Sequence, residues 1–333
     1  MILFVSGQYA GAQYIHPILE KWSTKKNFKW NLVATGASCK YWNETKIQYK
    51  QIKNYTAIKV SNYIDLAKPK LIITSASGNI ELEHLFILEA KKKSIPTASF
   101  IDVWTNYLLR FKYKEKFIFP DHILAIDNRC KEEMIKEGIP QNLIKIIGQP
   151  YLESISKNVP MLGPNILLAG QPIKKYFGNI LGYDEIDFKK ICLKAIKKTN
   201  YHDILNTKHP EEISFETKKN FETSSRKGRG YKDVVESHTV LGMFSMQMII
   251  GYLWGRKVAS IQPKSLKNDY SPLSRWGLIP ILKNTDEIIE FIEKKNFTEN
   301  QFDLIDLSKF RLSEFGIYSS IKNLEHLCKL YLI

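Results

Sequence analysis

The sequence lacks the features that mark several common classes of protein. No apolar run reaches the roughly 18 residues that a membrane-spanning helix needs, and the longest extends only from Met243 to Trp254. The apolar N-terminus, Met1 to Ala12, has no basic flank before it and no cleavage site after it, so it is interpreted as a buried strand rather than a signal peptide. We therefore predict a cytoplasmic protein that is at most peripheral on the inner membrane.

Cysteine is scarce, and its spacing carries no metal or disulfide pattern. The four cysteines lie far apart and form no Cys-x-x-Cys pair, which argues against a zinc site and against a disulfide framework. They are Cys39, Cys130, Cys192 and Cys328. A reducing compartment fits this usage, and no metal site is predicted.

Glycine-rich nucleotide motifs are also missing. The two glycines of GQYAGA, Gly7 and Gly11, lack the Gly-x-Gly-x-x-Gly spacing of a dinucleotide fingerprint, and no Gly-Lys-Ser/Thr follows them. Two interpretations of this turn stay open. Either the backbone of Gly7 and Gln8 approaches a ligand, or the turn is purely structural.

What the sequence has in excess is positive charge. Its 49 basic and 34 acidic residues give a formal net charge of +15, which favours an anionic partner such as a nucleotide, a nucleic acid or an anionic membrane surface. A lysine-rich composition is also typical of proteins encoded by AT-rich genomes. The lysines are spread along the chain without an RNP-like, KH-like or helix-turn-helix signature, so no nucleic-acid partner is expected. The basic stretches 174–177 and 224–232 are candidates for peripheral membrane contact.

Short β-rich runs alternate with helix-length amphipathic stretches over residues 1–150. This alternation is typical of βαβ units and predicts a Rossmann-like domain with a parallel sheet. The expected strands are Ile2–Val5, Leu32–Ala34, Leu71–Thr74, Thr97–Ile101, Ile123–Ile126 and Ile144–Ile147.

A proline-rich stretch, residues 151–164, then reads as a linker. Alternation resumes over residues 165–333 and predicts a second Rossmann-like domain, with helices expected over Asp184–Thr199 and Thr285–Lys295, the second capped by Thr285. Its expected strands are Ile166–Ala169, Ile204–Asn206, Val258–Ile261 and a short run at Ile281 and Leu282. The predicted fold class is therefore α/β, with two Rossmann-like domains facing a cleft.

The stretch Ser237 to Pro263 contains the strongest candidate for an anion site. A short apolar run leads into a small-residue turn at Gly242 to Ser245, and an apolar helix begins near Ser245. Free N–H groups and the helix dipole at such a turn favour a phosphate. Lys208 and His209 follow another predicted strand, where a His beside a Lys can hold a phosphate and stabilise a leaving nucleotide. The candidate nucleotide and phosphate contacts are Gly170, Gln171, Lys208, His209, Gly242, Met243, Phe244 and Ser245.

Residues 101–111 form the densest polar and aromatic cluster of the first half. Asp102 comes directly after a strand and is a candidate general base. Trp104 is a candidate to stack on a sugar, while Asn106 and Arg110 offer hydrogen bonds or charge. The alternative is that Asp102 caps a helix and the aromatic rings pack internally.

A second polar run follows the third predicted strand. Ser75 and Ser77, in the segment TSASGN, either cap the next helix or contact a ligand at the end of the strand.

The arrangement resembles the GT-B glycosyltransferases. The features that carry this resemblance are the Lys208-His209-Pro210 tripeptide, the later small-residue helix start and the segment GRKVASIQP that ends the apolar helix. Within that group it is most similar to bacterial transferases of CMP-activated acidic sugars, sialyltransferase-like and Kdo-transferase-like, which carry a His-Pro motif and a later Ser/Thr motif. The resemblance implies that His209 contacts the donor phosphate, that Ser245 with the turn at Gly242 contacts the same phosphate, and that Asp102 is the base.

Two departures from that pattern are visible. The paired Ser-Ser of the sialyltransferases is a single serine here, in Phe244-Ser245, and the acidic-acidic-Gly base motif has no clear match. Asp102 is assigned by its position after a strand.

The sequence therefore predicts a glycosyltransferase that moves a sugar from a nucleotide-sugar donor, CMP-activated by the resemblance, to a hydroxyl of a glycan or lipid-linked glycan acceptor. Such acceptors occur in lipopolysaccharide and capsule synthesis. The chain contains no Asp-x-Asp to hold a metal on a diphosphate, so metal-independent transfer with no cofactor is expected. A nucleotide-sugar epimerase or hydrolase and a polyol-phosphate transferase stay as alternatives, because the same phosphate-holding parts serve all of them. A basic nucleic-acid-binding protein is the lower alternative.

Overall fold

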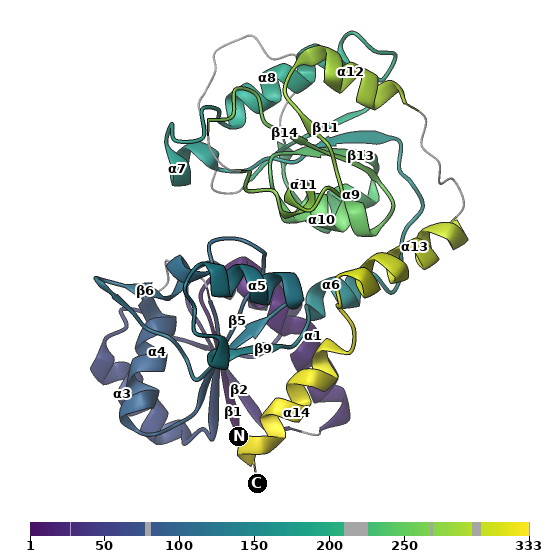
Figure 1. Cartoon of the computed structure of the whole chain (residues 1–333). Coiled ribbons are helices and arrows are strands. Elements are labelled where there is room, and N and C mark those ends of the chain that lie inside the picture. Colours follow the sequence, from purple (N-terminus) through teal and green to yellow (C-terminus); the bar gives the residue numbers. More distant parts are fainter. Residues whose placement is uncertain (27, 77–80, 210–225, 267–268, 295–300, 333) are drawn as a thin grey trace. The chain divides into compact units, whose positions relative to one another are not determined.

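The computed structural model describes residues 1–26, 28–76, 81–209, 226–266, 269–294 and 301–332 (Figure 1). The chain divides into two compact units. Unit 1 comprises Met1–Ile155 with Leu312–Ile333, and unit 2 comprises Ser156–Arg311. Each unit is described by itself.

Unit 1 is built on a seven-stranded parallel sheet with the order β3-β2-β1-β4-β5-β8-β9. The chain adds β2 and β3 on one side of β1 and then returns to add β4 on the other side. This reversal makes the carboxyl ends of β1 and β4 the topological switch point, where open α/β sheets bind ligands. The strands are β1 (Ile2–Ser6), β2 (Trp30–Ala34), β3 (Lys50–Gln51), β4 (Leu71–Ser75), β5 (Thr97–Phe100), β8 (His122–Ala125) and β9 (Ile144–Ile146).

Helices lie on both faces of this sheet (Figure 1). Because both faces are covered, β1 is buried at every position, which explains why it reads as a continuous apolar run rather than an alternating one. A short antiparallel hairpin of β6 (Lys112–Tyr113) and β7 (Lys116–Phe117) follows the 3₁₀ turn Leu108–Phe111. The helices are α1 (Tyr9–Lys25), α2 (Gly36–Thr45), α3 (Ala57–Ala67), α4 (Glu81–Lys92), α5 (Asn128–Lys136) and α6 (Pro150–Ile155), with a 3₁₀ turn at Gln141–Leu143.

The C-terminal helix α14 (Ser320–Leu332) belongs to unit 1, although it is far from the rest of that unit in sequence. Leu324, Leu327 and Cys328 are buried in the same apolar cluster as Trp22, and the Trp22 indole N–H donates to Glu325 at 3.1 Å. The chain leaves unit 2 within α13 (Gln301–Glu314). Gly148 has φ +106°, and a side chain there would meet Ser320 at the start of α14, so this docking requires glycine.

Unit 2 repeats the design with a six-stranded parallel sheet in the order β12-β11-β10-β13-β14-β15. Its switch point lies at the carboxyl ends of β10 and β13, which pair directly. The strands are β10 (Asn165–Leu168), β11 (Ile204–Lys208), β12 (Arg226–Lys227), β13 (Ser237–Gly242), β14 (Lys257–Ile261) and β15 (Ile281–Leu282). The helices are α7 (Ile173–Phe177), α8 (Glu185–Ile196), α9 (Tyr231–Val235), α10 (Met246–Leu253), α11 (Pro272–Arg275) and α12 (Thr285–Glu293).

The structure differs from the sequence prediction in three details. The second domain was expected to extend to residue 333, whereas residues 312–333 belong to unit 1 because their apolar face packs there. The expected linker, residues 151–164, begins inside helix α6, and only residues after Ile155 are irregular up to β10. Asn284, not Thr285, caps α12, because its side chain accepts from the Asp286 and Glu287 N–H groups.

Candidate functional site

The switch point of unit 2 brings together the loops that follow β10 and β13. The Gln171 Oε1 atom accepts the Phe244 N–H at 2.7 Å, a contact between residues 73 positions apart. The Ser260 hydroxyl, from the end of β14, donates to the Met243 carbonyl at 2.6 Å. Both bonds engage the single peptide group between Met243 and Phe244, one at its N–H and one at its carbonyl. Three predicted contacts, Gln171, Met243 and Phe244, therefore lie in one connected turn.

Gly242 is the last residue of β13 rather than the start of the turn. A Cβ atom at this position would lie 2.7 Å from the Met248 sulfur and 3.3 Å from the Ala169 Cβ. A side chain at position 242 would therefore force the Met248 side chain to move, so glycine is favoured where α10 packs against the end of the sheet. Close packing of α10 is therefore the structural reason for this glycine. The N–H groups of the turn belong to the residues that follow it in sequence.

Ser245 precedes α10 in the N-cap position but does not act as a cap, because its side chain makes no hydrogen bond to the helix N–H groups. The Ser245 Oγ atom is buried and has no hydrogen-bond partner within the part of the chain that the structure describes. A buried hydroxyl without a partner is costly, and such groups in native proteins call for an explanation. The first N–H groups of the helix lie beside this hydroxyl.

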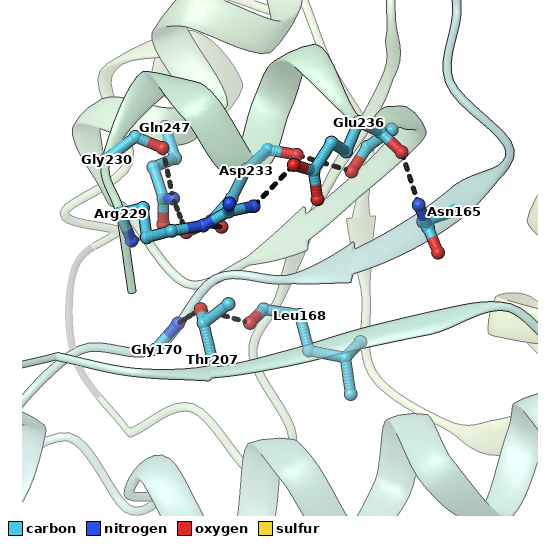
Figure 2. A network of polar contacts seen from close by, with 10 residues as sticks. Asn165, Leu168, Gly170, Thr207, Arg229, Gly230, Asp233, Glu236 and Gln247 are labelled. Carbon is cyan, nitrogen blue, oxygen red and sulfur yellow. Dashed lines mark hydrogen bonds and ion pairs between the residues drawn. The ribbon is translucent and has the colours of Figure 1, made fainter. Parts of the chain in front are cut away.

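Thr207, fully buried at the end of β11, ties that strand to β10 (Figure 2). Its hydroxyl donates to the Leu168 carbonyl at 2.8 Å and accepts the Gly170 N–H at 3.3 Å. Lys208 is the last residue of β11, and its carbonyl accepts the Gly228 N–H at 2.9 Å. The exposed His209 follows it directly, so the structure places Lys208, His209 and Gly170 at the same carboxyl edge of the sheet.

A second network of polar contacts joins α9, the turn before it and the first turn of α10 (Figure 2). The Asp233 carboxylate is completely buried and accepts from both the backbone N–H and the guanidinium of Arg229, at 2.6 and 3.2 Å. The Gln247 amide, in the first turn of α10, donates to the Gly230 carbonyl at 2.8 Å. The turn before α9 is thus fastened to the helix that follows the Ser245 position.

Three partly buried rings gather next to the Gln171 turn. Phe244 lies 5.7 Å from Phe177 and 5.7 Å from Tyr270, and the latter two ring centroids are 5.0 Å apart. Phe177 comes from α7 and Tyr270 from the segment before α11. Rings that remain partly exposed in such a group offer a surface for a flat ligand.

The switch point of unit 1 is arranged differently. The Glu83 carboxylate, only 3% exposed, accepts the Gly7 N–H at 3.0 Å and the Ser75 hydroxyl. Gly7 follows β1 and Ser75 ends β4, so a side chain from α4 joins the two strands that flank the switch point. The backbone N–H of Gly7 is therefore occupied by an internal anion.

Asp102 lies next to this switch point, after β5. Its Oδ1 atom accepts from Arg110 at 2.7 Å, and the same guanidinium nitrogen donates to the Ala76 carbonyl at 2.7 Å. Both side chains are mostly buried. The Asp102 carbonyl accepts from the Gln149 amide at 3.1 Å. Among the described residues the second carboxylate oxygen, Oδ2, accepts no hydrogen bond, so one oxygen of a firmly held carboxylate remains open.

Trp104 was predicted to be a sugar-stacking residue, and the structure does not place it for that role. The ring is completely buried, packs 5.9 Å from Phe315 and donates its indole N–H to Asp127 at 2.8 Å. Burial raises the pKa of Asp127 to about 6, although the Cys130 N–H and the Trp104 indole both bond to the carboxylate. Trp104 is therefore a buried residue that holds the 101–111 segment in place within unit 1.

The remaining predicted acceptor residues divide by exposure. Asn106 is exposed and has φ +54°, a conformation that asparagine tolerates better than most residues. Gln8 precedes α1 and makes no side-chain cap. Ser77 lies outside the described residues.

Several supporting residues were not found from the sequence. Glu83 reads as an ordinary position in an amphipathic helix, and Gln149 and Asp233 have no motif around them. Buried acidic and amide side chains of this kind are recognised only when their long-range partners are known.

The sequence matches no protein-family profile and no curated protein, whereas its fold resembles many solved structures. A UDP-GlcNAc 2-epimerase from Methanocaldococcus jannaschii aligns over 95% of this chain and 99% of its own, with a TM-score of 0.62 and 14% identity. The Anabaena protein HepE, solved with UDP-glucose, aligns over 99% and 100% with a TM-score of 0.62 and 10% identity. The spinosyn rhamnosyltransferase SpnG, solved with thymidine diphosphate, aligns over 98% and 100% with a TM-score of 0.57 and 10% identity.

These similarities, which cover nearly the whole chain, confirm an α/β fold of the GT-B type with two Rossmann-like domains. At identities of 10–14% they establish the fold alone. Within the described ranges, none of the helices is long and apolar enough to cross a membrane.

Proposed function

We propose that this protein is a glycosyltransferase that uses a nucleoside-diphosphate sugar and transfers the sugar to a hydroxyl group. The observation that supports this most directly is the connected turn at the unit 2 switch point, where Gln171 bonds to Phe244 and the ends of β10, β11 and β13 meet. Lys208 and His209 add basic character at the same edge. A helix start and basic side chains at the same edge of a sheet are suited to the phosphates of a nucleotide.

In the proposed reaction, unit 2 holds the donor nucleotide and unit 1 supplies the base. The Asp102 carboxylate takes the proton from the acceptor hydroxyl as that oxygen forms a bond to the anomeric carbon of the sugar. The bond between this carbon and the phosphate oxygen breaks, and the nucleoside diphosphate leaves with the electron pair. Lys208 and His209 stabilise the negative charge that develops on the leaving phosphate.

The donor is proposed to carry uridine diphosphate, because related folds were solved with UDP and with UDP-glucose. CMP, which the sequence resemblance implied, is the alternative nucleotide. A thermal-shift screen against UDP, CDP, CMP and GDP distinguishes them, since a ligand that binds only the folded protein raises its apparent stability. A shift with CMP and none with UDP would replace the uridine assignment.

His209→Ala tests the phosphate role. We expect the Kd for UDP to rise about 10- to 100-fold, the value of a charge-assisted hydrogen bond, with an unchanged melting temperature in the absence of ligand. His202→Ala is the matched control, because His202 is exposed on the loop before the same strand. Equal UDP affinity in the His209→Ala and wild-type proteins would contradict the assignment.

Epimerisation of a nucleotide sugar is the second candidate, because an epimerase of this fold aligns over 95% of the chain with a TM-score of 0.62. Product analysis separates the two reactions. A transferase releases UDP only when an acceptor glycan is present, free or lipid-linked, whereas an epimerase interconverts the nucleotide sugar without any acceptor. Turnover without acceptor would favour the epimerase.

A further inference from the structure

The β6–β7 hairpin of unit 1 presents apolar side chains to solvent. Leu109, in the 3₁₀ turn that leads into the hairpin, is 61% exposed, and Phe117, at its end, is 46% exposed. The register pairs Lys112 with Phe117 and Tyr113 with Lys116, which leaves a two-residue turn at the tip.

Three lysines lie along the hairpin. Lys112 pairs with Phe117 and shares its face, whereas Lys116 pairs with Tyr113 on the opposite face, and the Lys114 ammonium lies 5.4 Å from the Tyr113 ring centroid. Lys112, Lys114 and Lys116 are all exposed, and Glu115 is the one acidic residue between Leu109 and Phe117. Lys114 has φ +54°, a backbone conformation that glycine adopts at the first central position of such a turn without strain. The hairpin therefore carries a cation where local conformational preference favours glycine.

The hairpin is held firmly from beneath by other residues. Tyr113 stacks on His84 of α4 with ring centroids 5.4 Å apart, and Phe111 packs 5.5 Å from Phe119. The Ile118 N–H donates to the Phe111 carbonyl at 2.8 Å. Phe117 itself stacks on Phe119 with ring centroids 6.2 Å apart, so its exposed part lies on a packed base.

We propose that the hairpin surface, defined by Leu109, Lys112, Lys114, Lys116 and Phe117, binds anionic phospholipid membranes. Leu109 and Phe117 enter the boundary between headgroups and acyl chains, while the three ammonium groups remain at the level of the phosphates. Charge complementarity favours this partner, because Lys112 shares the face of Phe117, and Lys114 and Lys116 are exposed at the tip of the same hairpin. The neighbouring Arg110 takes no part, since its guanidinium is turned inward onto Asp102. The proposal does not depend on the reaction that the protein catalyses.

The surface differs from the two basic stretches that the sequence suggested for membrane contact. In stretch 174–177, Lys174 lies 3.6 Å from the Asp184 carboxylate, so part of that charge is neutralised within unit 2. Stretch 224–232 lies partly outside the described residues. The hairpin combines exposed charge with exposed apolar side chains on neighbouring positions.

Lys114→Gly is the sharpest test, because glycine suits the backbone conformation and the change removes the ammonium group, together with its contact 5.4 Å from the Tyr113 ring centroid. We expect the protein to co-sediment with vesicles of phosphatidylcholine containing phosphatidylglycerol and to bind vesicles of phosphatidylcholine alone much more weakly. One lysine near an anionic surface corresponds to about a fivefold change in affinity, so Lys114→Gly should weaken binding about fivefold. Lys26→Gly is the matched control, because Lys26 is also exposed and also has φ +54° but lies at the end of α1. It should bind as the wild type does.

The double variant Leu109→Ser with Phe117→Ser tests the apolar part. We expect at least a tenfold loss of vesicle binding. The melting temperature is measured alongside and should fall only slightly, because Leu109 is exposed and Phe117 loses one stacking contact, with Phe119. Equal binding of wild type to both vesicle types, or equal losses in Lys114→Gly and Lys26→Gly, would overturn the proposal. Single-stranded DNA that competes with vesicles, together with full vesicle binding by the double serine variant, would instead identify a polyanion surface and would also overturn it.

Discussion

The two units share one topology, yet their switch points are filled in opposite ways. In unit 1 a buried carboxylate, Glu83, bonds to the Gly7 N–H after β1 and to Ser75 at the end of β4. In unit 2 a neutral amide, Gln171, bonds to the Phe244 N–H after β13. Each side chain occupies a backbone N–H group at the place where a doubly wound sheet binds its ligand.

The difference in charge has a consequence for ligand choice. A second anion beside Glu83 would experience like-charge repulsion in a poorly solvated environment, so phosphate is disfavoured at the unit 1 switch point. Gln171 carries no charge and can be displaced or can turn its amide N–H₂ group toward a phosphate. Unit 1 instead offers Asp102, a carboxylate with one open oxygen, which is suited to a proton-transfer role. We infer that unit 1 supplies the catalytic base and that unit 2 binds the phosphates. Unit 1 is called the chemical half and unit 2 the phosphate half.

The largest expected effect concerns the chemical half. Asp102→Asn should lower kcat by 10²- to 10⁴-fold, the range for loss of a general base, and should leave the Kd for UDP within about twofold of wild type. Steady-state kinetics and calorimetric titration with UDP provide the two values. If the variant lost UDP affinity as well as kcat, Asp102 would also contribute to donor binding. The proposed separation of roles between the two units would then be wrong.

A charge exchange tests the phosphate half. Gln171→Glu keeps an oxygen acceptor for the Phe244 N–H but places a negative charge at the turn, so UDP affinity should fall about a thousandfold, since unit charges near 4 Å at a protein surface repel by about 4 kcal/mol. Glu83→Gln is the reciprocal control and should leave UDP affinity unchanged, because unit 1 holds no phosphate in our proposal. A comparable loss in both variants would refute the comparison.

Burial of carboxylates in unit 1 also predicts a pH dependence of stability. The folded-state pKa of Asp127, about 6, lies above its ordinary value of 3.8, so the folded protein binds the extra proton within this window. Stability should therefore fall as pH rises from about 4 to about 7, by up to about 3 kcal/mol.

Asp127→Asn removes the titrating group. Denaturant unfolding of wild type and variant at about pH 4 and about pH 7 therefore isolates the contribution of Asp127 to the free energy of unfolding. The free energy of unfolding of wild type, relative to the variant, should be higher at the lower pH. If the difference in free energy of unfolding between wild type and variant did not change with pH, the Asp127 carboxylate would have an ordinary pKa.

The longer strands were predictable, because buried parallel strands such as β1 and β4 are largely apolar runs bounded by turns. The two-residue strands β3 and β12 carry no such run and are defined only by their neighbours. The return of α14 to unit 1 was not predictable, since it depends on Trp22 and Gly148, more than 170 positions earlier.

The candidate site was predictable as a set of positions but not as a set of roles. Residues after strands were correctly interpreted as lying at the carboxyl edges, because a parallel sheet brings these ends together. Which of them face a ligand depends on partners distant in sequence. Trp104 is turned inward by Asp127, and Gly7 is occupied by Glu83, a residue that periodicity assigns only to a helix.

The smallest expected effect separates ligand binding from folding at one hydroxyl. The Ser245 Oγ atom is buried and has no partner among the described residues, so Ser245→Ala should cost the free protein nothing in melting temperature. If the hydroxyl donates to the donor phosphate, UDP affinity should fall about fivefold, the value of one hydrogen bond of about 1 kcal/mol. Ser308→Ala is the matched control, because the Ser308 hydroxyl is likewise buried and without a described partner in unit 2 but lies on α13. Unchanged UDP affinity with a lowered melting temperature in Ser245→Ala would make the hydroxyl structural and leave the helix N–H groups as the phosphate contacts.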